Sequence, residues 1–440
     1  MERKRVKSYD EQIFHLFLRN KNEEKKPSVQ ITFQVTDACN LACTYCYQIN
    51  KSHHSMPLEL AKEFIDNLLD GKYNNYLNYD EVESIVIDFI GGEPLLEIDL
   101  IDNIIKYFLQ QLIDRDHHWL YRHRFSMCSN GVLYFSPKVQ EFIQKYKNQL
   151  SFAISIDGNK QLHDSCRVFP DGTGSYDLAM SGVKHYQQTF GGDSMGSKMT
   201  IAKENVAYIY DALQNLIEND YVDINLNCVF EEGWNAQDAK TLYEQLKLVT
   251  DYMIEHDLYD KIDLSIFKDH VGQPMLESDN NNWCGGTGAM LAVDWKGDLY
   301  PCLRYMESSV GTDQPAYKIG TVSGGIMTNQ AECDRVECLK CVTRRSQSTD
   351  ECFNCPIASD CAWCSAYNYQ VFGTADKRAT FICIMHKARV LANAYFWNKM
   401  YRIYEPHKRY KLNIPKEWAL EIIDESEWQF LKFLESNIVI

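Results

Sequence analysis

The chain has 440 residues, 45% of them hydrophobic, and a formal net charge of −16. This size predicts a folded protein of one large or two to three ordinary domains, and the acidic balance argues against general nucleic-acid binding, which needs a basic surface. No apolar run is long enough to span a bilayer, and no secretory signal follows the basic residues 1–5, so we expect a cytoplasmic protein with no membrane partner.

Cysteine is unusually frequent and unevenly placed. The sequence holds 16 cysteines, and ten of them fall between Cys284 and Cys383. In a reducing cytosol such a density favours metal or cluster ligation over disulfides.

Short apolar runs alternate with amphipathic stretches along the first half of the chain. We predict strands over residues 29–35, 84–90, 124–128, 151–156, 198–201 and 223–230, with helices such as 58–69 and 98–113 between them. Six strands alternating with helices predict an α/β fold, a partial (β/α)6 TIM-like barrel.

The remaining segments complete a division into five parts. Residues 1–28 form an N-terminal extension with a possible helix over 9–18, and residues 29–235 form the barrel. Residues 236–283 read as a helix over 236–259 and then a polar linker. We expect a Cys-rich domain over 284–400 and a helical tail over 401–440, where residues 418–434 predict an amphipathic helix.

Cys39, Cys43 and Cys46 form a CxxxCxxC motif directly after the first predicted strand. Three thiolates leave one iron of a four-iron cluster without a protein ligand, because such clusters normally take four. The alternative is a zinc knuckle or incidental core cysteines, although zinc prefers four ligands and no fourth lies nearby before His53. The motif, with Tyr45 before the third cysteine, resembles the signature of the radical S-adenosylmethionine (SAM) enzymes. This resemblance implies that SAM chelates the open iron and is cleaved to a 5′-deoxyadenosyl radical.

Gly91, Gly92, Glu93 and Pro94 follow the second predicted strand. Glycines let a backbone approach a ligand closely, and a carboxylate can accept hydrogen bonds from an ammonium group. The sequence resembles the radical-SAM motif that binds the amino group of the cofactor's methionine part.

Polar residues also end the third and fourth predicted strands, at Ser129, Asn130, Ser155 and Asp157. Both stretches resemble family positions that line the SAM pocket, whereas Asn-Gly and Asp-Gly pairs are equally strong turn formers. Arg167 could pair with the SAM carboxylate or face solvent.

The C-terminal cysteines favour two further clusters over zinc ribbons, which remain the alternative. Their order resembles the SPASM domain, an extension of radical SAM enzymes that holds two auxiliary [4Fe–4S] clusters. The resemblance assigns Cys352, Cys355, Cys361 and Cys383 to an outer cluster and Cys284, Cys302 and Cys364 to an inner one.

The inner set lacks a fourth cysteine at the usual upstream place, and Cys361 and Cys364 are closer in sequence than the family spacing. Cys333, Cys338 and Cys341 are candidates for the missing ligand. Otherwise the inner cluster keeps an open iron that could bind a substrate thiolate, since iron in such clusters takes soft ligands.

We therefore expect a radical SAM peptide maturase with SAM and three [4Fe–4S] clusters as cofactors. Its partners would be a Cys-containing precursor peptide, which it would cross-link through a thioether, and an electron donor such as flavodoxin or ferredoxin. Sulfatase maturases of this family generally carry Asp after the second inner cysteine, whereas Leu303 follows Cys302 here. A formylglycine-generating maturase and a carbon–carbon cross-linking maturase remain alternatives. Two further alternatives involve no SAM cleavage: an iron–sulfur electron carrier and a binding module stabilised by zinc.

Overall fold

The computed structural model describes residues 28–77, 82–190, 196–230, 233–282, 284–311 and 313–436. The helix predicted over residues 9–18 lies outside these residues. No helix among the described residues is both long and apolar enough to cross a membrane.

The larger sheet has eight strands in the order β11-β10-β9-β8-β1-β2-β3-β4. Neighbouring strands from β1 to β4 are parallel, as the alternation of strands and helices predicts. The strands are β1 (Ser28–Gln34), β2 (Ser84–Ile90), β3 (His123–Ser129), β4 (Leu150–Ile154), β8 (Met290–Val293), β9 (Asp298–Tyr300), β10 (Gly320–Thr321) and β11 (Gly325–Ile326).

The last predicted barrel strands form a separate sheet. Strands β5 (Ser197–Ile201), β6 (Asp223–Cys228) and β7 (Asp263–Leu264) are parallel to one another. Strand β7 lies in the segment that the sequence indicated as linker. Within the described residues the strand order shows no pairing between β4 and β5, and a cavity of about 860 Å³ is lined by residues of both strands. The α/β barrel architecture is confirmed, but the barrel consists of two sheets.

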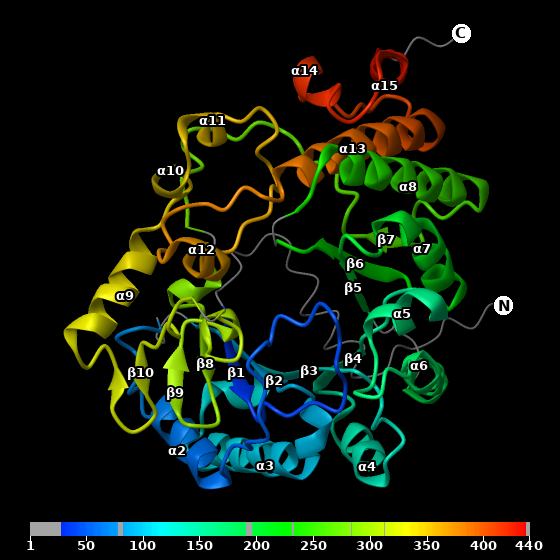
Figure 1. The fold of residues 1–440 in the computed structure, drawn as a ribbon. Helices are drawn as coiled ribbons and strands as arrows, with labels where there is room; N and C mark the ends of the chain where they lie inside the picture. Colours follow the sequence, from blue (N-terminus) through cyan, green and yellow to red (C-terminus); the bar gives the residue numbers. More distant parts are fainter. Residues whose placement is uncertain are drawn as a thin grey trace, which may run out of the picture.

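Helices cover the outer face of the strands (Figure 1). The outer face is apolar, as in the contact of Phe33 on β1 with Phe64 on α2, whose ring centroids lie 5.1 Å apart. The helices of this half are α2 (Leu58–Leu69), α3 (Ile98–Asp114), α4 (Pro137–Tyr146), α5 (Lys160–Cys166), α6 (Tyr176–Phe190), α7 (Ile209–Glu218) and α8 (Ala236–Glu255). Helix α8 ends before the predicted residue 259 because Asp257 has a φ of 54°, which a helix does not allow.

The inner face of the same strands is polar. Thr32 pairs in register with Asp88, Asp88 with Ser126, and Ser126 with Ser151, so one row of polar side chains crosses four strands. Because successive side chains in a strand point to opposite faces, the apolar outer face leaves this row for the interior.

The C-terminal half contacts the barrel in two places, at strand β1 and at helix α8. Strand β8 pairs in parallel with β1, and β9, β10 and β11 continue the sheet as antiparallel strands. Helix α13 (Cys383–Tyr404) packs against α8 (Figure 1). The other helices are α9 (Gln330–Cys341), α10 (Arg344–Gln347), α11 (Asp350–Phe353), α12 (Ser365–Phe372), α14 (Lys416–Ala419) and α15 (Glu425–Ser436).

The prediction of one helix over residues 418–434 is wrong. The tail forms α14 and α15 with a turn between them, because the Asp424 carboxylate accepts a hydrogen bond from the Glu427 backbone N–H at 2.8 Å and caps the second helix. Trp428 and Leu431 are buried where α15 packs on α13.

Candidate active site

The loop after β1 carries Cys39, Cys43 and Cys46, here called the N-terminal group. It lies directly against the Gly-Gly turn after β2, where the Glu93 N–H donates to the Ala38 carbonyl oxygen at 2.8 Å. A Cβ atom on Gly92 would lie 2.3 Å from that same oxygen. The lack of a side chain on Gly92 therefore allows the cysteine loop to approach the turn. From the sequence we expected the glycines to allow the approach of a ligand instead.

The thiols of the N-terminal group are half-buried. Burial raises the pKa of Cys39 and of Cys43, and the neighbouring thiols of the group raise both values further. Lys51, five residues after Cys46, lies near all three sulfurs, and their charges raise the pKa of its ammonium group although burial opposes this. Thiolates beside a cation suit a cluster, because a cluster ligand must be deprotonated.

Glu93 is almost fully buried behind this loop. Its carboxylate accepts hydrogen bonds from the Leu95 N–H at 3.0 Å, the Ser129 hydroxyl at 2.7 Å and the Asn130 N–H at 2.8 Å. Burial raises the pKa of Glu93, and these hydrogen bonds offset part of the rise. A carboxylate offers about four acceptor positions, so one position remains for an ammonium group.

Polar residues at the ends of β3 and β4 line the cavity beside the N-terminal group. The Asn130 amide donates to the Asn40 side-chain oxygen at 2.6 Å, which joins β3 to the cysteine loop. Ser155 lies 3.3 Å from the Cys128 sulfur. Gly91, Gly92, Glu93, Ser129, Asn130, Ser155 and Arg167 all line one cavity with the N-terminal group.

Asp157 and Arg167 bind each other. Arg167 Nε lies 2.7 Å from an Asp157 oxygen, and both side chains are largely buried. The Tyr45 hydroxyl donates to the same carboxylate, and its ring lies under the guanidinium. Asp157 does not line the cavity beside the cysteines, so a direct contact with a cofactor stays a prediction for it.

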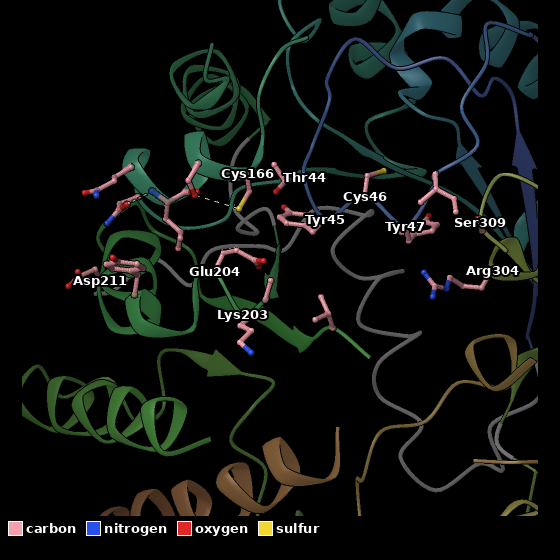
Figure 2. A pocket seen from close by; sticks show the side chains of 18 of the residues that line it. Thr44, Tyr45, Cys46, Tyr47, Cys166, Lys203, Glu204, Asp211, Arg304 and Ser309 are labelled. Carbon is pink, nitrogen blue, oxygen red and sulfur yellow. Dashed lines mark hydrogen bonds between the residues drawn. The ribbon is translucent and has the colours of Figure 1, made fainter. Parts of the chain in front are cut away.

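The cavity beside the N-terminal group has a volume of about 500 Å³. A second cavity of about 820 Å³ adjoins it, because both are lined by Tyr45, Cys46, Tyr47, Val229 and Arg304. Figure 2 shows Cys46, Tyr47 and Arg304 on one side of this second cavity and Lys203, Glu204 and Asp211 on the other. A small cofactor and an extended chain could therefore meet beside Cys46.

Sequence reasoning missed two charged residues of the inner face. Asp88 on β2 and Lys198 on β5 line the first cavity, where burial raises the pKa of Asp88 and Lys198 offsets part of the rise. Their signal was the alternation of apolar and polar residues within each strand, which marks the inward positions.

The C-terminal cysteines fall into two groups. Cys284, Cys302 and Cys364 form the inner group, where burial raises the pKa of Cys302 to about 12 and both other thiols add to the rise. The outer group consists of Cys352, Cys355, Cys361 and Cys383, where burial raises the pKa of Cys361 to about 12 with a further contribution from the other three thiols. The structure thus brings together the two sets that the SPASM resemblance assigned, although their role as cluster ligands stays a prediction.

Cys333, Cys338 and Cys341, the candidates for the missing ligand of the inner group, all lie on helix α9. The Cys333 thiol contacts the Met327 carbonyl oxygen at 3.5 Å, Cys338 lies beside Tyr317, and Cys341 is exposed. None of the three contributes to the raised pKa values of Cys284 and Cys302. Across the described residues, no three His, Cys, Asp or Glu side chains lie close enough together to hold a single metal ion.

Comparison with known proteins defines the class of this fold. Residues 28–161 match the model of a 4Fe-4S single cluster domain. The structure resembles that of anSMEcpe with bound AdoMet and the Cp18Cys peptide, with a TM-score of 0.58 and 15% identity over 86% of this chain and 99% of that chain. It also resembles Streptococcus suis SuiB bound to the precursor peptide SuiA, with a TM-score of 0.51 and 15% identity over 81% and 76% of the two chains. The protein has a radical SAM/SPASM-type fold.

The chain is also similar in sequence to proteins of other organisms. A serine-type anaerobic sulfatase-maturating enzyme of Bacteroides thetaiotaomicron is 22% identical over 76% of this chain and 82% of its own. An uncharacterized protein of Methanocaldococcus jannaschii is 30% identical over 42% of this chain, and the match spans 58% of that protein's length. The relatives also include a radical SAM cyclopropyl synthase, TigE, of Paramaledivibacter caminithermalis, which is 22% identical over 81% of this chain and 71% of its own.

Proposed function

We propose that this protein is a peptide maturase that removes a hydrogen atom from a precursor peptide and joins a cysteine sulfur of that peptide to the resulting carbon. The observation that carries the proposal is the pair of adjoining cavities. One contains the N-terminal group and the glycine turn, and the other, of about 820 Å³, is large enough for several residues of a peptide.

The donor set of the first cavity fits SAM and a [4Fe–4S] cluster. Three thiols would hold the cluster, and Glu93 has one acceptor position for the amino group of SAM. When bound and reduced, these cofactors would supply a 5′-deoxyadenosyl radical. The protein's own part is to hold the reacting carbon near Cys46 and to exclude other hydrogen donors.

The second cavity suits an extended peptide. Tyr45, Tyr47 and Tyr208 supply apolar surface, while Lys203 and Glu204 supply charges of both signs. Two structural neighbours contain peptides, SuiA in SuiB and Cp18Cys in anSMEcpe. This likeness supports a peptide as the substrate class of this chain.

Formation of a thioether releases two hydrogens, one as a hydrogen atom and one as a proton, together with an electron that needs an acceptor. The inner and outer groups would hold the two auxiliary clusters that accept this electron, which a ferredoxin or flavodoxin would finally take. Leu303 lines the first cavity at the position where sulfatase maturases carry an acidic base, which disfavours formylglycine formation here.

The test is anoxic incubation of the protein with SAM, a reductant and candidate Cys-containing peptides. A thioether product has lost two hydrogens, keeps its sulfur and no longer reacts with iodoacetamide. A carbon–carbon cross-link has the same mass but leaves the thiol reactive, and formylglycine made from cysteine has lost its sulfur. An iron content on the order of twelve per chain is expected if three clusters are bound. Release of 5′-deoxyadenosine without any change in the peptides would contradict the proposed substrate class.

A further inference from the structure

Tyr305 lies three residues after Cys302, on the short 3-10 helix Leu303–Tyr305 that begins at this cysteine. Its side chain is fully buried, at 0% exposure. Within the described residues its hydroxyl group has no hydrogen-bond partner of normal geometry. A buried hydroxyl without a partner costs free energy, which calls for an explanation.

The hydroxyl faces the inner group. Burial raises the pKa of Tyr305 well above its ordinary value, and Cys284, Cys302 and Cys364 all add to the rise, so all three thiols lie near the hydroxyl. Ser365 lies beside the same hydroxyl, and its Oγ is 2.9 Å from the Cys284 sulfur.

The hydroxyl groups of the neighbouring tyrosines donate hydrogen bonds to backbone carbonyl oxygens. Tyr76, also near Cys284 and Cys302, donates to the Gly286 carbonyl oxygen. Tyr317 and Tyr369 pack against Tyr305, yet their hydroxyls donate to Arg335 and Pro315 carbonyl oxygens at 2.9 Å and 2.9 Å. Among the tyrosines of this cluster, Tyr305 is the one whose hydroxyl lies near all three thiols of the inner group and has no hydrogen-bond partner of normal geometry in the described residues.

We propose that Tyr305 is a positioning residue whose hydroxyl donates a hydrogen bond to a sulfur of the cluster held by Cys284, Cys302 and Cys364. This inference rests on the proposed function, because it requires that the inner group holds a cluster. A donor aimed at a cluster sulfur stabilises the added electron of the reduced state and raises the reduction potential. Tyr305 would thereby help the inner cluster to accept the electron released from the peptide.

The test compares Tyr305→Phe with the matched control Tyr317→Phe in the loaded, full-length protein. The first change removes the unused donor, and the second removes a hydroxyl that serves a backbone carbonyl in the same tyrosine cluster. Redox titration followed by electron paramagnetic resonance is expected to show a lower potential for the inner cluster in Tyr305→Phe. We expect the same variant to release iron severalfold faster to a chelator, and Tyr317→Phe to match the wild type in both measurements.

The outcomes separate the inference from the proposed function. An unchanged inner-cluster potential in a Tyr305→Phe protein that holds the cluster would overturn the inference alone. Cys302→Ala should remove one cluster signal from the electron paramagnetic resonance spectrum of the wild type. If the two spectra are the same, the inner cluster and the inference are both overturned. Because phenylalanine fills the same space and removes an unsatisfied group, folding of Tyr305→Phe is expected to be preserved, which urea unfolding can verify.

Discussion

The guanidinium of Arg167 and the carboxylate of Asp157 form a buried ion pair, with Nε and an Oδ atom 2.7 Å apart beneath the cysteine loop. The pair joins the end of α5 to the end of β4, and Tyr45 from the cysteine loop donates to the same carboxylate. It therefore fixes three chain segments around the candidate active site.

Arg167→Gln should destabilise the protein by about 3–5 kcal/mol, because it leaves the Asp157 carboxylate buried without a cation. The control is Lys138→Gln, which removes the partner of Asp99 where both side chains are about two-thirds exposed, and it should cost less than about 1 kcal/mol. Urea unfolding of the anoxic proteins measures both. Equal stability of the two variants would show that the buried pair is not needed to hold the loop.

Cys43→Ala should abolish release of 5′-deoxyadenosine and lower the iron content, because two thiols cannot retain the N-terminal cluster. Cys166→Ala is the matched control, since Cys166 is a buried thiol that lines the neighbouring cavity without belonging to the motif. Chromatography of anoxic reactions with SAM gives the product yield. Normal 5′-deoxyadenosine formation by Cys43→Ala would refute the assignment of this cysteine.

Gly92→Ala should displace the cysteine loop, because the added methyl group would lie 2.3 Å from the Ala38 carbonyl oxygen and 2.8 Å from Cys39 Cβ. We expect loss of most N-terminal cluster iron while the chain stays folded. Gly196→Ala is the control, as its added Cβ would meet no atom of the described residues closer than 4.0 Å. Wild-type absorption and iron content in Gly92→Ala would show that the loop accommodates the clash by a small shift.

Local patterns made much of this site predictable. The spacing of Cys39, Cys43 and Cys46 and the alternation within Ser84–Ile90 are short-range features that a linear sequence displays. The pairing of β8 with β1 joins residues about 260 positions apart, and no local pattern encodes such a contact. The unused hydroxyl of Tyr305 is likewise visible only once the partners of its neighbours are known.

Cys361→Ala should lower the iron content and the yield of modified peptide, while the N-terminal cluster and its cleavage of SAM persist. The reason is that the two groups consist of different thiols, because the thiols that raise the pKa of Cys361 are Cys352, Cys355 and Cys383 and none belongs to the N-terminal group. Cys341→Ala is the control, since Cys341 is an exposed thiol on α9 outside both groups. Unchanged iron in Cys361→Ala would contradict the outer cluster.

His163 should make the fold sensitive to mild acid. Burial lowers its pKa from 6.5 to about 4, with Arg167 adding to the effect, and its ring nitrogens face the Ser175 hydroxyl at 3.0 Å and the Asp157 N–H at 3.4 Å. Because the folded-state pKa lies below the unfolded-state value, the stabilisation is present above pH 6.5 and is lost as the pH falls toward 4. The unfolding free energy should therefore drop by about 1 kcal/mol between about pH 7.5 and about pH 5.5 through this residue.

The measurement is urea unfolding of wild type and His163→Gln at both pH values, with the exposed His270→Gln as the control. His163→Gln should be less stable than wild type at the higher pH, because it loses a buried side chain that fits its polar neighbours. The difference between the two proteins should shrink at the lower pH, since glutamine has no proton to take up. If the difference is the same at both pH values, His163 does not change its protonation on unfolding, and the acid sensitivity must come from other groups.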